Sequence, residues 1–213
     1  MNDLPEIRIK DAWLLRQEAS THLHKLWGKD GEPLADDEWM EQRVSEYQGA
    51  WKPFERKVLA GMTEIMKLSF KQNVIDVYIA PWFHAFSDPL VVGVIYEPDL
   101  FVDILTHELL HRLLTDYVSR SESDDLLSEW KKLFGENHSR AELVHIPVHA
   151  VHKALYLDVL KAPERLQRDI ERATKHGATA YIKAWEYVES HDDKELIEKL
   201  KALYKSLVST SNS

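Results

Sequence analysis

One segment, residues 98–119, limits the possible folds of this chain more than any other. It opens with Pro98 and Asp99, a pair that predicts the start of a helix with Asp99 as its N-cap. From there the segment is nearly continuously apolar, so a helix formed by it is apolar on most sides. Such a helix needs neighbours around most of its circumference. We therefore expect residues 98–119 to form a buried helix inside one sizeable core.

The remaining pattern predicts mostly helices with a small β component. Apolar side chains recur at three- and four-residue steps in several segments, which we interpret as helices at residues 11–27, 36–70, 123–134, 139–160, 163–175, 178–190 and 192–208, with a break at Pro53. Residues 73–80 and 90–96 are rich in β-branched and aromatic side chains and predict strands, and residues 7–9 could form a short third one. With 7 Gly and 8 Pro, the chain has few turn residues for an all-β fold. The predicted fold class is α+β, mostly helical.

Composition narrows the class of protein further. A chain of 213 residues with 44% hydrophobic side chains suits a single domain, which we divide into N-terminal helices at 1–72, a central core at 73–160 and C-terminal helices at 161–213. A formal net charge of -9 argues against a nucleic-acid-binding surface. No apolar run reaches the roughly 18 to 20 residues of a membrane span, and no secretory signal is visible. We expect a cytoplasmic protein that needs neither nucleic acid nor membrane as a partner.

The buried helix carries a polar motif, His107-Glu108-Leu-Leu-His111. Residues four apart share a helix face, so the two imidazoles can bind one Zn²⁺, and Glu108 can reach a water on that metal. The apolar residues around the motif would bury these polar groups, and buried polar groups need partners. The chain has 11 His and no Cys, so any metal must be held by His, Asp or Glu. We predict a zinc site at His107 and His111, with Glu108 as the general base.

A hydrolytic zinc site of this kind needs a third protein ligand. The helix expected at 139–160 offers a polar stripe at three- and four-residue steps, made of Glu142, His145, His149, His152 and Tyr156. We take Glu142 as the first choice, with His145 and then His149 as alternatives; the rest could orient the ligands or stabilise an oxyanion. A structural interpretation also exists for each, because Ser139-x-x-Glu142 is a capping-box pattern and the others can be hydrogen-bonded interior groups.

The order of these elements resembles that of the zincin metallopeptidases: a pair of strands, a helix with His107-Glu108-x-x-His111, then a later helix that offers a glutamate. Within the zincins the chain resembles the gluzincin and minigluzincin-like branch, although Ala141 and Ile146 stand where that branch usually has Asn and Asp. The resemblance implies a zinc-dependent metallopeptidase, a hydrolase of peptide or protein substrates, with catalysis by Glu108 and metal at His107, His111 and Glu142. It also implies that strand 90–96 or a neighbouring strand is the sheet edge that aligns an extended substrate.

Two other interpretations use the same residues. Glu108-x-x-His111 and Glu142-x-x-His145 match the paired motifs of ferritin-like di-iron bundles, in which Glu64 and Glu129 would supply further carboxylates. Against this, the segment 123–134 is short for a bundle helix, the strands would interrupt the bundle, and His107 would have no role. The metal could also belong to a non-catalytic domain that binds a partner. Two irons per chain, in place of one zinc, would favour the di-iron protein.

Overall fold

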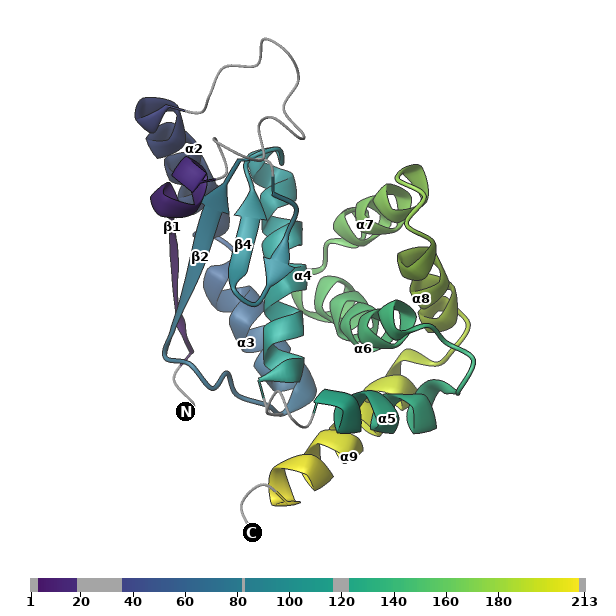
Figure 1. The fold of residues 1–213 in the computed structure, drawn as a ribbon. Coiled ribbons are helices and arrows are strands. Elements are labelled where there is room, and N and C mark those ends of the chain that lie inside the picture. The colour runs from purple at the N-terminus through teal and green to yellow at the C-terminus, as the bar shows by residue number, and fades with distance from the viewer. Residues whose placement is uncertain (1–3, 19–35, 82, 117–122, 211–213) are drawn as a thin grey trace. The chain divides into compact units, whose positions relative to one another are not determined.

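The computed structural model describes residues 4–18, 36–81, 83–116 and 123–210 (Figure 1). These residues form helices and one small mixed sheet, so the predicted α+β class is confirmed. The chain divides into two compact units. The first unit comprises Met1–Arg56 and Gln72–Leu109, and the second comprises Lys57–Lys71 and Leu110–Ser213. Two compact units can belong to one domain, so the single domain expected from the sequence stays a prediction.

The sheet lies in the first unit and has the strand order β1-β2-β4-β3. Strand β1 (Glu6–Asp11) runs parallel to β2 (Val74–Ala80), and β2 runs parallel to β4 (Leu90–Gly93). Strand β3 (Phe86–Ser87) is antiparallel to β4. The strands predicted at 7–9 and 73–80 are confirmed. The strand predicted at 90–96 ends earlier, at Gly93, and β3 was not predicted.

Strand β4 is not an edge of this sheet. Val91 pairs with Tyr78 of β2 on one side and with Phe86 of β3 on the other. The expected substrate-aligning edge was strand 90–96 or a neighbouring strand; since β4 is an inner strand, only the second alternative stays a prediction. Within the described chain, the outer strands are β1 and the short β3, the latter being the neighbour that the resemblance also allowed.

Strand β4 ends at Gly93, where only a glycine fits. A Cβ atom at this position would lie 1.9 Å from the backbone oxygen of Phe83, far inside contact distance. The close approach of these two backbone segments shapes the end of the strand.

Helix α2 (Asp37–Trp51) packs on β1 and anchors the first unit. It begins after Asp36, whose side chain accepts a hydrogen bond from the Trp39 amide at 2.8 Å. On its inner face the Tyr47 ring stacks on Phe101 at 4.0 Å between centroids, and the Tyr47 hydroxyl donates to the backbone oxygen of Tyr96 at 2.6 Å. Tyr47 thus joins α2 to the loop that follows β4 and to the next helix.

Helix α4 (Pro98–Thr115) has the buried character predicted from its sequence. Phe101, Leu105, Leu109 and Leu113 are all 0% exposed. The helix begins at Pro98 itself, so Asp99 lies within its first turn and the predicted N-cap role of Asp99 is wrong. Residues 117–119 of the predicted helix lie outside the described residues.

The second unit is built from helices around α6 (Arg140–Ala154). Its other elements are most of α3 (Glu55–Met66), α5 (Ser123–Phe134), the π-helical segment η2 (Leu155–Leu160), α7 (Pro163–Lys175), α8 (Thr179–Glu189) and α9 (Asp193–Thr210). Helix α6 contacts α5, α8 and α9, and the Tyr204 hydroxyl of α9 donates to the Leu114 carbonyl at 2.7 Å. The predicted helices of this region are confirmed, as is the break at Pro53 between α2 and α3, but α3 ends at Met66 rather than at residue 70, and residues 155–160 are π-helical.

The start of the chain was predicted as a helix at 11–27. Residues 13–18 are helical, and residues 19–27 lie outside the described residues. In the described part of the chain, no helix combines the length and the apolar character that crossing a membrane would require.

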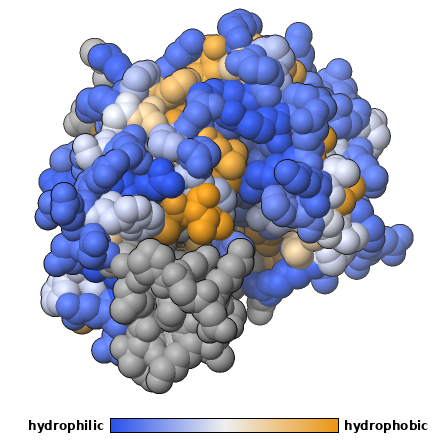
Figure 2. Space-filling view, turned by 90° about the horizontal axis from the view of Figure 1, so that it is seen from above, coloured by the Kyte–Doolittle hydropathy of each residue, from blue (hydrophilic) through white to orange (hydrophobic). Residues whose placement is uncertain are grey.

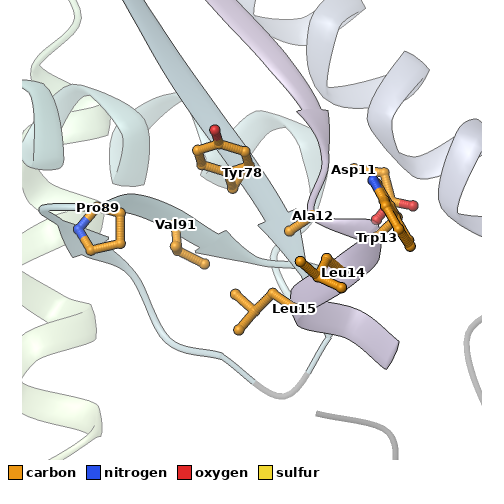
Figure 3. Close-up of a pocket in the computed structure, with 8 residues that line it drawn as sticks. All are labelled: Asp11, Ala12, Trp13, Leu14, Leu15, Tyr78, Pro89 and Val91. Atoms are coloured by element: carbon orange, nitrogen blue, oxygen red, sulfur yellow. The ribbon is translucent and has the colours of Figure 1, made fainter. Parts of the chain in front are cut away.

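The first unit also contains an apolar pocket of about 290 Å³. Figure 3 shows its lining, which comes from the end of β1 and the residues after it, from β2, from β4 and from the residue before β4: Asp11, Ala12, Trp13, Leu14, Leu15, Tyr78, Pro89 and Val91. Figure 2 shows apolar patches set within a mostly hydrophilic surface. The carboxylate in the pocket lining, Asp11, forms a 2.8 Å ion pair with Arg16. The pocket therefore offers apolar contact rather than a set of metal ligands.

Candidate metal centre

Helix α4 places both motif histidines on one face. His107 and His111 lie four residues apart, which is about one helical turn. The boundary between the two compact units falls after Leu109, but α4 is one unbroken helix, so the helix alone sets the spacing of these two side chains. His107 is 3% exposed and His111 is 9% exposed. The predicted burial of the motif is confirmed.

Helix α6 brings His145 next to His111. The helix begins after Ser139, whose hydroxyl accepts a hydrogen bond from the Glu142 amide at 3.3 Å, and His145 follows in the second turn. The rings of His111 and His145 meet edge to face, with 5.1 Å between centroids and an angle of 89°. The Nδ1 atom of His145 lies 2.7 Å from the Ala141 backbone oxygen, which fits a protonated Nδ1 that donates to this carbonyl. That tautomer leaves Nε2 with its lone pair available.

The three histidines have the spacing of a metal-binding group. One ring nitrogen from each of His107, His111 and His145 lies within 4.8 Å of the other two. Nitrogens bound tetrahedrally at about 2.0–2.1 Å from Zn²⁺ are roughly 3.3–3.4 Å apart, so modest side-chain rotations would bring these three to bonding distance. Three imidazoles are also a donor set that suits zinc and leaves a fourth position open. The residues present therefore fit a zinc ion.

The protonation state of the histidines also fits a metal site. Burial lowers the pKa of His111 to about 3, and the neighbouring His145 adds to the shift. Burial likewise lowers the pKa of His145. Both imidazoles are therefore neutral near pH 7, which is the form that binds metals.

Glu142, the first choice for the third ligand, is not part of this group. Its carboxylate lies 3.1 Å from Nδ1 of His138 and 3.5 Å from the Lys183 ammonium. Burial opposes ionisation of Glu142, but the hydrogen bonds from His138 and Ser139 and the charge of Lys183 outweigh it and lower its pKa. The geometry favours the second choice, His145, because the carboxylate of Glu142 is held among these partners near the N-terminus of α6.

Further along α6 and into η2, the polar stripe runs into the core of the second unit. His149, His152 and Tyr156 are each 0% exposed. His152 faces Asp169 of α7 with 3.9 Å between Nδ1 and Oδ2, and its ring lies 4.6 Å from that of Tyr156. None of these three side chains belongs to the metal-binding group found among the described residues.

Sequence reasoning missed the side chains of α8 that contact this stripe. Tyr181 packs on His145, with 3.9 Å between ring centroids, and Trp185 stacks on His149 at 4.1 Å. Their spacing of four residues equals that of the two histidines and could have indicated a matching helix face.

Glu108, the predicted general base, is buried on α4 at 7% exposure.

The extra carboxylates of the di-iron alternative are engaged elsewhere. Glu64 pairs with Lys67 on the surface, and Glu129 pairs with Lys132 at 2.5 Å. The Glu64 side chain is 77% exposed. Neither glutamate joins a metal-binding group among the described residues.

Comparison of the chain with protein-family models, with curated proteins and with solved structures finds no match in any of the three.

Proposed function

We propose that this chain is a zinc-dependent hydrolase and, by substrate class, a peptidase. His107, His111 and His145 hold the metal, and Glu108 is the general base. The observation that carries the proposal is the convergence of the three imidazole nitrogens within 4.8 Å, on two helices that are otherwise largely apolar. This convergence supports metal binding, because one ion can bind all three imidazoles at once.

A zinc ion bound there supplies a water of lowered pKa and polarises the substrate carbonyl. Glu108 follows His107 directly on α4 and turns about 100° away from it, which suits a role beside the metal rather than on it. As the water oxygen bonds to the carbonyl carbon, Glu108 takes the water proton. When the C–N bond breaks, Glu108 delivers that proton to the leaving amine. The hydrolysis consumes one water and needs no other reactant.

The peptide substrate class is supported by the His-Glu-x-x-His motif, which pairs a metal with a carboxylate base suited to amide hydrolysis. The lack of cysteine is compatible with a reducing compartment, and a cytoplasmic location remains part of the proposal.

Two measurements on protein purified without a His tag test the proposal. The first is metal content by elemental analysis, where we expect one zinc per chain. The second is hydrolysis of labelled casein and of a quenched fluorescent peptide library, by wild type and by Glu108→Gln. The variant should retain zinc and lose activity by about 10²-fold or more. Glu186→Gln, which changes an exposed glutamate of α8, is the matched control and should keep both.

Each possible result separates the alternatives. Full activity in Glu108→Gln, or no metal in wild type, would overturn the zinc hydrolase. Two irons per chain would favour the di-iron protein. One zinc per chain with no hydrolysis by wild type of either substrate set would favour the non-catalytic metal-binding domain.

A further inference from the structure

Helix α8 presents two aromatic side chains to two histidines of α6. Tyr181 lies on His145 with 3.9 Å between ring centroids and 38° between planes. Trp185 lies on His149 with 4.1 Å between centroids and 9° between planes. The two residues on each helix are four apart, so the two pairs follow one another along the contact between α6 and α8. All four residues belong to the second unit.

The two pairs differ in burial. Trp185 is 2% exposed and His149 is 0% exposed, so their pair is part of the core. Tyr181 and His145 are only half-buried. The tyrosine therefore covers the more exposed of the two imidazoles, and the tryptophan covers the enclosed one.

Several neighbours contact the His145 ring and set its orientation. Its Nδ1 is held at 2.7 Å from the Ala141 carbonyl, and its edge-to-face contact with His111 leaves 5.1 Å between their centroids. The first contact is a hydrogen bond within α6, which still allows the ring to swing about it. The Tyr181 ring lies against the face of the imidazole and blocks that swing.

We propose that Tyr181 is a positioning residue for the third metal ligand. Its ring, rather than its hydroxyl, keeps the imidazole of His145 in the orientation that directs Nε2 toward the metal. This inference rests on the metal centre proposed above. Groups that orient metal ligands commonly contribute 10- to 100-fold in metal affinity, because an unoriented side chain must lose its rotational freedom when the metal binds.

The experiment compares Tyr181→Ala and Tyr181→Phe with wild type. Apo proteins are titrated with zinc in a chelator-buffered series, and Co²⁺-loaded proteins give the visible absorption spectrum of the site. We expect Tyr181→Ala to bind zinc about 10- to 100-fold more weakly and to show a changed Co²⁺ spectrum. Tyr181→Phe, which keeps the ring, should match wild type in both. Trp185→Phe is the control for general loosening of α8 and should leave affinity within about twofold.

The outcomes separate this inference from the proposed metal centre. Absence of zinc binding in wild type refutes the centre itself. Zinc binding in wild type with equal affinity in Tyr181→Ala overturns the positioning role alone. If Tyr181→Phe weakens zinc binding as much as Tyr181→Ala does, the effect belongs to the hydroxyl. If Trp185→Phe weakens it equally, the effect belongs to helix packing. Either result also overturns the proposal. Circular dichroism of each apo variant shows whether the fold is retained, and a variant that unfolds is replaced by Tyr181→Leu.

Discussion

Zinc should stabilise this protein against heat, and the residue that controls the effect should be His145 rather than Glu142. A ligand that binds only the folded state adds RT ln(1 + [L]/Kd) to the free energy of unfolding, or about 2.7 kcal/mol when free zinc is 100 times Kd. For a chain of 213 residues, 1 kcal/mol corresponds to roughly 2–4 °C in Tm. Wild type should therefore gain about 5–11 °C.

The two variants should then behave in opposite ways. If His145→Ala weakens binding by about 100-fold, the same free zinc only equals its Kd, and the gain shrinks to about 0.4 kcal/mol, or about 1–2 °C. Glu142→Ala should keep the full zinc-dependent gain. Its apo Tm should fall, because it loses the contact with His138 and the pair with the exposed ammonium of Lys183, together worth about 1–2 kcal/mol.

Differential scanning calorimetry in chelator-buffered zinc measures both effects, with His191→Ala as the control for surface imidazoles. His191 is exposed and lies just after α8. His191→Ala loses its stacking on Tyr187, so its apo Tm should fall, but it should keep the full zinc-dependent gain. A wild-type gain in Tm for His145→Ala, or its disappearance in Glu142→Ala, would refute the ligand assignment.

Three further predictions concern the scaffold. Tyr47→Phe should lower the free energy of unfolding by about 1–3 kcal/mol. Burial raises the pKa of Tyr47 to about 12, so the Tyr47 hydroxyl stabilises the fold below pH 10, and this stabilisation is lost as pH rises toward 12. Urea unfolding over this pH range should show the loss in wild type but not in Tyr47→Phe. Gly93→Ala should cost about 3 kcal/mol or more by the same assay, because its Cβ meets the Phe83 carbonyl; an unchanged midpoint would contradict this. Ser139→Ala should cost about 1 kcal/mol through loss of the α6 N-cap, and Ser139→Asp should restore it.

The helices of this fold could be predicted well because their limits depend on local chemistry. Asp36 and Ser139 act as N-caps, and Pro163 begins α7 at the residue predicted. Gly135, with a φ of 111°, follows the end of α5 as expected for a glycine in this role. Each of these signals acts within a few residues of where it stands in the sequence.

The sheet was harder to predict because strand neighbours are set over long distances in the chain. The pattern of β4 indicates a strand but does not say which strands flank it, and β3 is too short to produce a pattern. The interior place of β4 follows from its pairing with β2 and β3 together.

The candidate site could likewise be predicted only where the signal is local in the sequence. The two motif histidines could be predicted because one helix carries both. The stripe on α6 offered Glu142, His145 and His149 within two turns, and helix spacing alone does not choose among them. The choice depends on which of them meets His111 and on what else contacts each one, and the partners of Glu142 come from the preceding turn and from α8.

The interleaving of the two compact units bears on how the protein is synthesised. The chain enters the second unit at Lys57, returns to the first at Gln72 and leaves it again at Leu110. During translation, β1 emerges long before its partner β2, and residues 57–71 emerge before the rest of their own unit. A nascent chain paused in this interval carries an unpaired strand and an uncovered apolar helix, which is the kind of surface that chaperones bind and that aggregates. All of the first unit has been made once Leu109 emerges, whereas the second unit still needs the chain that follows.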